Sequence, residues 1–245
     1  MKTKLIAFDV TKALETSVGE IVAGIDGSSP TAKEQLVQAG IPNLPRALDQ
    51  ADFGLIQKHF SSERENLDPY AIALELSKVL PRPVNVSDGR LYIDLVNLPD
   101  IQQWLAVLRG LDQKIKLLVA GLGLAENGLV DSDLNSLEGF DNLETLELSS
   151  NRIGSKGAIK LGKFSRLEAL YLRKNPIGNR GIPPLTKLRR LKFLLLSGTK
   201  INDRAYDSLV RIPFLEELSI NDVSLTVDLL LALKARFRQV NCALD

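Results

Sequence analysis

The sequence predicts an α/β solenoid, with a parallel sheet on the concave face of a right-handed arc and helices or irregular turns outside. Four segments share one apolar pattern and begin at Leu143, Leu167, Leu191 and Leu215, a constant interval of 24 residues. Such an interval is typical of stacked repeats, because one unit cannot bury its apolar face alone. Aromatic residues make up 5% of the chain and leucine dominates, which suits a core of many similar medium-sized positions.

Within each repeat, alternating apolar and polar residues predict a short strand with one buried face. In the first copy, Leu146 and Leu148 flank Glu147, which is the two-residue period of a half-buried strand. Between this strand and Leu161, the glycine-punctuated run at 154–160 predicts a turn into a short amphipathic helix.

An asparagine marks the end of the predicted strand in two of the repeats. Asn151 and Asn175 occupy equivalent positions, where a buried amide can satisfy backbone groups that the turn leaves unpaired. Stacked copies would form a ladder of amides. Thr199 and Val223 replace asparagine in the next two repeats, so we expect the ladder to fade and the repeat at Leu215 to turn differently.

These residues resemble the leucine-rich repeat superfamily over about residues 143 to 244. The run NRIGSKGAIKL at 151–161 resembles its ribonuclease-inhibitor-like subclass, in a short 24-residue version of bacterial type. The resemblance implies a binding scaffold, and it supplies no catalytic residue.

We expect this repeat domain to span 84–245, beginning with a capping hairpin at 84–96 around the turn Asp88-Gly89. A helix is predicted around 101–108. Repeats are predicted from about 115, 143, 167, 191 and 215, and the first of them places Gly123 at the asparagine position. A helix at 227–237 and a truncated closing strand at 239–245 follow, with Cys242 and Leu244 at buried positions.

Residues 1–83 lack the repeat, and clusters of glycine, serine and proline cut them into helix-sized pieces. Apolar spacing predicts helices at 31–39, 45–60 and 68–80, the last opened by Asp68-Pro69. We expect a helical N-terminal region that caps the first repeat. The alternative is an adaptor or effector activity, because 44–60 resembles an F-box helix over fewer than 20 residues.

The composition restricts the cellular compartment and the kinds of active site that we expect. The single cysteine, Cys242, excludes an internal disulfide, no signal-like apolar stretch follows Met1, and no apolar run is long enough to span a bilayer. We therefore expect a cytoplasmic protein without membrane insertion; an effector exported without a cleavable signal would have the same features. His59 is the only histidine, which excludes a multi-histidine metal site, and the sequence has neither a phosphate-binding loop nor a complete dinucleotide-binding motif. We therefore expect no metal site, no cofactor and no enzymatic activity.

Charge is banded along the chain although the net charge is only +1. Between 152 and 192, twelve basic residues face one acid, Glu168, whereas the flanking stretches are acidic. On a solenoid this order becomes a basic band that could steer an anionic partner, or a solvated outer surface. The band residues that we single out are Lys156, Lys160, Lys163, Arg166, Lys187, Arg189 and Arg190.

Residues that alternate with the buried leucines are predicted to point from the concave face. An aromatic and aliphatic cluster on that surface has the composition of an interface hot spot. We therefore predict a protein-binding surface, which a second copy of the chain could also cover. Its residues are Tyr171, Arg173, Phe193 and Leu195, with Glu147 and Glu217 at the rim. The alternative function is nucleic-acid or anionic-surface binding through the band 152–192.

Overall fold

The computed structural model describes residues 68–242, which belong to one compact unit, Glu65–Asp245. The helices predicted at 31–39 and 45–60, the F-box-like stretch and His59 lie outside the described residues.

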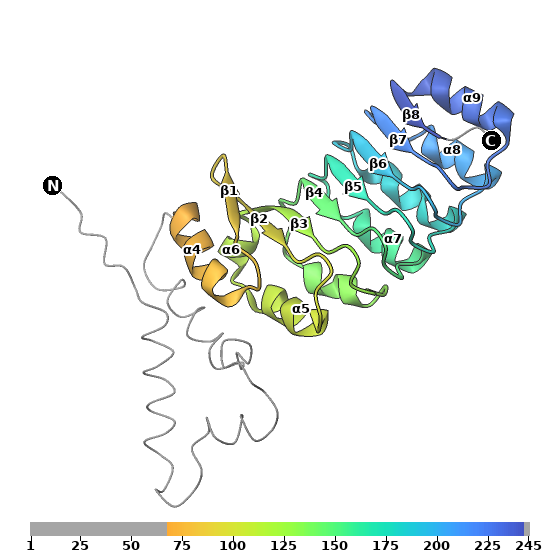
Figure 1. Ribbon diagram of the computed structural model, residues 1–245. Coiled ribbons are helices and arrows are strands. Elements are labelled where there is room, and N and C mark those ends of the chain that lie inside the picture. Colours follow the sequence, from red (N-terminus) through yellow and green to blue (C-terminus); the bar gives the residue numbers. More distant parts are fainter. Residues whose placement is uncertain (1–67, 243–245) are drawn as a thin grey trace, which may run out of the picture. The chain divides into compact units, whose positions relative to one another are not determined.

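Eight strands form one sheet in sequence order, as Figure 1 shows. Strands β1 and β2 are antiparallel, and every later strand pairs parallel to the one before it. The parallel α/β solenoid predicted from the sequence is therefore confirmed. The strands are β1 (Asn85–Ser87), β2 (Arg90–Asp94), β3 (Val119–Gly123), β4 (Thr145–Glu147), β5 (Ala169–Tyr171), β6 (Phe193–Leu195), β7 (Glu217–Ser219) and β8 (Gln239–Asn241).

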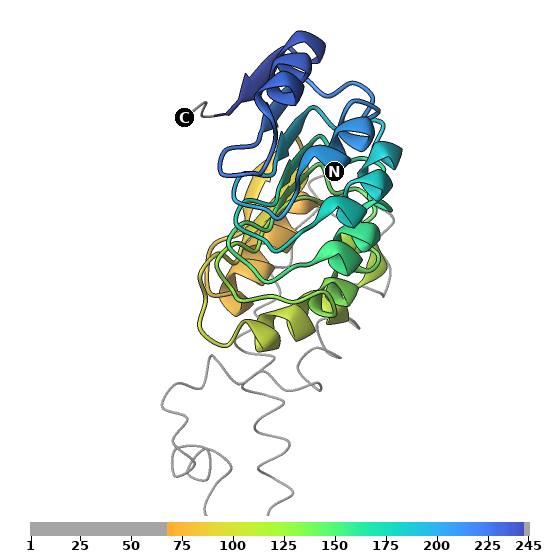
Figure 2. The same ribbon diagram turned by 90° about the vertical axis from the view of Figure 1, so that its right-hand side faces the viewer.

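The helices and 3₁₀ turns that connect the strands lie on one side of the sheet, as Figure 2 shows. Pro183 and Pro184 stand where the third full repeat would continue an α-helix, and a 3₁₀ turn replaces it there. The outer elements are α5 (Ile101–Gly110), α6 (Gln113–Lys116), η2 (Asp133–Leu137), α7 (Ser155–Leu161), η3 (Asn179–Gly181), η4 (Pro183–Lys187), η5 (Asp203–Ala205), α8 (Tyr206–Leu209) and α9 (Val227–Arg236).

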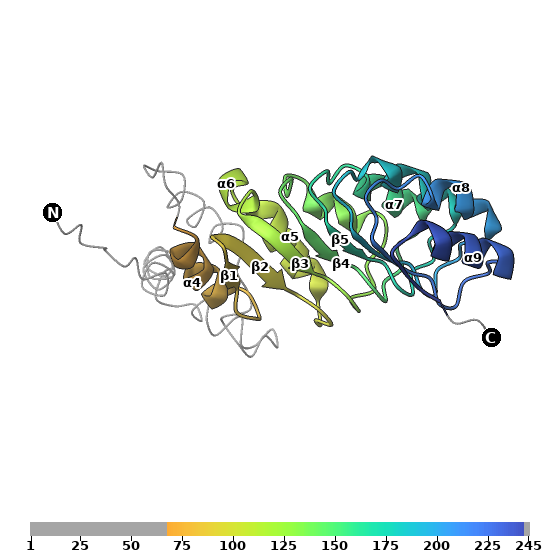
Figure 3. The ribbon, with the colours of Figure 1, turned by 90° about the horizontal axis from the view of Figure 1, so that it is seen from above.

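Helix α4 (Pro69–Val79) precedes the β1–β2 hairpin and packs against it (Figure 3). Asp68 opens this helix, because its carboxylate accepts a hydrogen bond from the Tyr70 N–H at 3.0 Å. The face of α4 that carries Ile72 and Leu76 is buried. The hairpin turns at Asp88 and Gly89, both with positive φ (50° and 70°), as the Asp-Gly signal predicts.

The pairing of β4, β5 and β6 follows the 24-residue repeat without any offset. Leu146 pairs with Leu170 and Leu170 with Leu194, so equivalent residues stack from strand to strand. All three side chains are fully buried, as is Leu218 in β7. The predicted alternation of buried and outward residues is therefore confirmed, and the core consists of these leucine columns.

The predicted amides cross-link neighbouring repeats. Asn151 accepts hydrogen bonds from the Asn127 and Leu129 N–H groups at 3.1 and 2.9 Å, and it donates to the carbonyls of Leu124 and Leu148 at 3.0 and 2.8 Å. Asn175 likewise accepts from the Ile153 N–H and donates to Leu148.

The first repeat of the array differs from the prediction. Residues 113–116 are helical, and β3 starts at Val119, with Leu122 paired to Leu146. The repeat therefore begins 24 residues before Leu143 and places Asn127, not Gly123, at the asparagine position. Periodicity in Ile115, Leu118 and Ala120 was misleading, because a helical turn and the following strand both bury apolar residues there.

The closing strand is shifted as well. Val240, not Cys242, pairs with Leu218 in the column of buried strand residues, because the last crossover is shorter than the others. Cys242 is half-buried instead of lying in the core.

The turns out of the strands share one backbone feature. The residue before the asparagine position has positive φ in all five repeats, at Glu126, Ser150, Lys174, Gly198 and Asp222. The expectation that the last repeat turns differently is therefore wrong for this feature. Pairing with the neighbouring strands fixes the chain direction even where no amide is present.

Candidate functional site

The sheet register arranges the outward-facing side chains in rows across the strands. One row runs through Tyr92, Gly121, Thr145, Ala169, Phe193, Glu217 and Gln239. The next row runs through Asp94, Gly123, Glu147, Tyr171, Leu195, Ser219 and Asn241. Because neighbouring strands lie about 4.8 Å apart, adjacent members of a row touch or nearly touch.

Apolar residues in these rows gather on β5 and β6. Ala169 lies directly opposite Phe193, and Tyr171 directly opposite Leu195. The Phe193 side chain is 37% exposed, whereas Ala169 is buried and Tyr171 is half-buried. The flanking strands present polar residues instead, with Thr145 and Glu147 on β4 and Glu217 and Ser219 on β7.

Leu195 corrects one sequence-based prediction. Its exposed fraction is only 8%, so it cannot serve as a protruding contact residue. In its row it lies between Tyr171 and Ser219, which shield it from both sides. Leu195 fills the space between these neighbours, and Tyr171 and Phe193 provide the accessible surface of the cluster.

The two rim carboxylates each accept a hydrogen bond within the domain. Glu147 accepts from the Ser149 N–H at 2.6 Å, and Glu217 accepts from the Asn241 amide at 2.8 Å. Both side chains are half-buried and are held in place at the edges of the apolar cluster. Arg173, just beyond β5, is exposed and has no ion pair among the described residues.

Gly121 and Gly123 on β3 leave space for side chains of β2 at the N-terminal end of the same face. A Cβ atom on Gly121 would lie 2.3 Å from Cδ1 of Tyr92, and one on Gly123 would lie 3.2 Å from Oδ1 of Asp94. The Tyr92 ring therefore lies across β3, where a larger residue would displace it. This arrangement was not predicted, because the glycines were assigned to a different register.

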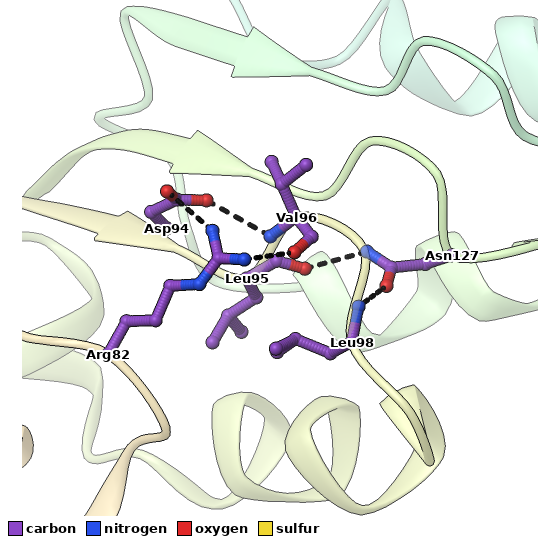
Figure 4. Close-up of polar contacts among 6 residues, drawn as sticks. All are labelled: Arg82, Asp94, Leu95, Val96, Leu98 and Asn127. Carbon is purple, nitrogen blue, oxygen red and sulfur yellow. Dashed lines mark hydrogen bonds and ion pairs between the residues drawn. The ribbon is translucent and has the colours of Figure 1, made fainter.

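The Asp94 carboxylate forms an ion pair with Arg82, as Figure 4 shows. Arg82 donates to the Asp94 carboxylate at 2.8 Å and to the Val96 carbonyl at 2.7 Å. The Asn127 amide fastens the same loop by accepting from the Leu98 N–H at 2.8 Å and donating to the Leu95 carbonyl at 2.7 Å. This polar cluster holds the loop after β2 against the first full repeat.

A column of ion pairs runs beside the rows, at the residue just before each of β4 to β8; its first cation, Arg90, is the first residue of β2. Glu144 pairs with Arg90, Glu168 with Lys192 at 2.7 Å, and Glu216 with Arg238 at 3.8 Å. The Glu168 hydrogen bond and charge raise the pKa of Lys192. We call this column the ion ladder; its sequence signal is the charged second position of the repeat, which the apolar periodicity does not include.

The predicted basic band divides into parts with different environments. Lys160 is engaged within the domain, because its ammonium donates to the Asp131 carbonyl at 2.8 Å and to Asn135 Oδ1 at 2.6 Å. Lys156 is exposed near the start of α7. The other five residues lie in the turns that lead back to the sheet and are exposed: Lys163, Arg166, Lys187, Arg189 and Arg190.

The described residues provide neither a metal-binding cluster nor a membrane-spanning helix. Across residues 68–242, no cluster of three or more histidine, cysteine, aspartate or glutamate residues could hold a metal ion. Within the same range, no helix is both long and apolar enough to cross a membrane.

Comparison with known proteins agrees with the repeat. A family model described as "Leucine Rich repeat" matches residues 142–162. None of the curated proteins matches the sequence. The chain shares 19% identity with an internalin (inlF) from Listeria monocytogenes at a TM-score of 0.46, covering 61% of this chain and 39% of that one. For a pollen receptor kinase 3 the identity is 13%, the TM-score 0.38 and the coverage 65% and 76%.

The strand register, the amide ladder and the family match at residues 142–162 identify stacked leucine-rich repeats in this chain. Leucine-rich repeat proteins generally mediate protein–protein interactions as non-enzymatic scaffolds. The chain spans 39% of the length of the internalin, so that protein's interactions say nothing direct about this one.

Proposed function

We propose that this protein is a non-enzymatic scaffold that binds a protein partner on the sheet face, centred on Tyr171 and Phe193. The observation that carries the proposal is the apolar cluster on β5 and β6, bordered on both sides by polar strands. An apolar centre within a polar rim is the usual anatomy of a protein interface, and aromatic residues dominate its energetics.

The geometry of the two aromatic side chains supports this role. Phe193 and Tyr171 are diagonal neighbours on adjacent strands, a relation within reach of contact between aromatic side chains. Ala169, directly beside Phe193, is too small to cover the ring. A partner can therefore reach both rings at once, and the exposed Arg173 adds a cation at the border of the same surface.

We expect the rim residues Glu147 and Glu217 to affect the orientation of the bound partner more than its affinity. The hydrogen bonds to Glu147 and Glu217 hold these carboxylates at opposite borders of the cluster. Charges at the rim of an interface mainly affect the association rate and the choice of partner. The partner we infer therefore presents an apolar anchor with basic groups on either side of it.

The test is capture from nuclease-treated lysate of the source organism with wild-type protein and the double variant Tyr171→Ala/Phe193→Ala. The matched control is Tyr70→Ala/Leu74→Ala, which removes an exposed aromatic and an exposed aliphatic side chain from α4. A partner retained by the control and lost by the sheet variant, with both variants folded by circular dichroism, supports the proposal. Equal capture by all three proteins refutes the sheet site.

A crosslinking experiment gives a second readout without depending on stability. A photoreactive phenylalanine analogue at position 193 should form a crosslink to the captured partner, whereas the same analogue at position 70 should not. Crosslinks from position 70 alone would move the binding surface to α4.

A further inference from the structure

A second surface lies along the edge of the sheet where the strands begin. Arg166, Arg190, Phe214 and Arg236 each stand three residues before the first residue of β5, β6, β7 and β8. Those first residues pair in register from Ala169 to Gln239, so the four residues form one column, in which Arg236 is the last residue of α9. All four are exposed, at a spacing of about 4.8 Å per strand.

A second column of cations runs parallel to the first. Lys163, Lys187 and Arg211 stand three residues further back in the same repeats, and Arg189 lies between the two columns. These residues are exposed as well. We call the two columns together the start edge; it contains seven cations around one aromatic side chain.

Nearby acids do not neutralise this charge. The carboxylates closest in the repeat are Glu144, Glu168 and Glu216, and the ion ladder engages each of them with a different cation. Across residues 68–242, none of the seven cations of the start edge has an ion pair. Two of them, Lys163 and Arg236, lie over neighbouring phenylalanine rings.

Phe214 is the most informative residue of the start edge. Its side chain is 71% exposed, the highest value among the large apolar residues described. Its backbone has a φ of 58°, a conformation that bulky residues rarely adopt and that glycine and asparagine accept readily. The ring therefore contributes little burial and occupies an unfavourable backbone position, so folding alone does not explain a phenylalanine here.

We propose that the start edge binds single-stranded nucleic acid, with a base stacked on Phe214 and phosphates held by the arginines of its column. Base stacking on an exposed aromatic side chain flanked by cations is the usual way in which proteins hold unpaired strands. The guanidinium fork suits phosphate, because it can donate two parallel hydrogen bonds.

The arrangement fits a single strand better than the other polyanions. The cations follow a narrow line across consecutive strands, which matches a linear polymer. An acidic peptide would use the cations without needing the ring. An anionic bilayer would gain the insertion of only one apolar side chain. The start edge is separate from the Tyr171 and Phe193 cluster, so this proposal does not depend on the protein-binding one.

Fluorescence anisotropy with a labelled oligouridylate of about 20 nucleotides and the full chain tests the proposal. Affinity should fall with salt. The variant Arg166→Gln/Arg190→Gln should bind more weakly and reduce the slope of log affinity against log salt by about 1.4, since each phosphate contact contributes about 0.7. The matched control Lys156→Gln/Arg180→Gln removes the same charge near the starts of α7 and η3 and should keep the wild-type slope.

Phe214→Asn separates binding from folding. Loss of the stacked base should weaken oligonucleotide binding by roughly 5-fold to 100-fold. The urea midpoint should stay the same or rise, because asparagine tolerates the positive φ better than phenylalanine. Tyr171→Ala/Phe193→Ala should leave oligonucleotide affinity unchanged, which keeps this test distinct from that of the sheet site.

Several outcomes would overturn the proposal. They are no oligonucleotide binding at low salt, an equal loss in the control pair, and full affinity in Phe214→Asn. Phosphatidylserine vesicles or poly-glutamate that bind more tightly than the oligonucleotide, and lose binding in Arg166→Gln/Arg190→Gln, would assign the start edge to a membrane or an acidic protein instead.

Discussion

The first three full repeats and the last two have the same backbone but different polar interiors. Asn127, Asn151 and Asn175 each bridge to the preceding repeat, or to the loop before it, with hydrogen bonds to backbone groups. In the last two repeats, Thr199 donates only to its own strand at 2.7 Å, and Val223 has no polar side chain. The strand pairing nevertheless continues without interruption to β8.

This comparison separates what the amides do from what the apolar columns do. Leu170 in the first group and Leu218 in the second are both fully buried, and the positive φ recurs at Ser150 and Asp222. The stacked core and the strand ladder therefore fix the repeat geometry. The amides satisfy buried backbone groups, which stabilises the geometry without defining it.

The substitutions with the largest expected effect test whether the buried leucines are equivalent in the first three repeats and in the last two. Leu170→Ala and Leu218→Ala should each lower the free energy of unfolding by about 2–5 kcal/mol, because both leave a cavity in a close-packed core. Urea unfolding followed by circular dichroism measures the loss. Phe193→Ala is the control, since its exposed ring should cost much less. A Leu218→Ala loss below the control value would show that the last repeats do not share the core.

Removal of an amide should distinguish the two groups. Asn151→Ala leaves the buried Leu129 N–H without its partner, at a cost of about 1–3 kcal/mol for each buried group left unpaired. Thr199→Ala removes a single hydrogen bond and should cost about 0.5–1.5 kcal/mol. Equal losses in the same urea assay would contradict a special role for the asparagines.

The reverse substitution should extend the ladder into the second group. Thr199→Asn offers an amide oxygen to the Ile177 N–H, by analogy with Asn175 and Ile153; this N–H now donates to the Asn175 carbonyl, two residues before it, at 2.8 Å. We expect a gain of about 0.5–1.5 kcal/mol in the free energy of unfolding. Val223→Ala is a suitable control, because it changes the equivalent position of the next repeat without adding an amide. A loss of stability in Thr199→Asn would mean that the turn around Gly198 cannot seat the larger side chain.

The smallest expected effect is a pH dependence of stability that comes from Lys116, a lysine buried beside the first repeat. Burial lowers the pKa of Lys116 from 10.5, against the opposing charges of Glu138 and Asp112. Between the folded-state pKa and 10.5, the unfolded chain binds more protons at this group than the folded protein. Wild-type stability should therefore rise with pH through this window relative to Lys116→Met.

Lys192→Met is the matched control for that experiment. The pKa of Lys192 is raised, chiefly by its hydrogen bond to Glu168, so its contribution is fully present below 10.5 and declines only at higher pH. Urea unfolding from neutral pH to 10.5 should show a rising difference for Lys116→Met and a constant one for Lys192→Met. A constant difference for both would contradict the burial effect at Lys116.

Much of the fold was predictable from the sequence because its physical signals are local. The 24-residue interval, the alternation around Leu146 and the Asp-Gly turn each depend on neighbouring residues, and the structure shows all three. The register error at Ile115 arose where a helical turn meets a strand, because both elements bury apolar residues and periodicity cannot separate them. The error at Cys242 arose because the last crossover is shorter than the others.

The sequence by itself determined the class of protein, the leucine columns and the amide positions, since a repeat imposes the same local environment on each copy. Only the tertiary structure decided which outward residues are reachable. It buries Leu195 between its row neighbours, engages Lys160, and pairs the acids of the ion ladder. It also leaves Phe214 exposed, because exposure depends on what lies on the adjacent strands, and strand neighbours are distant in sequence.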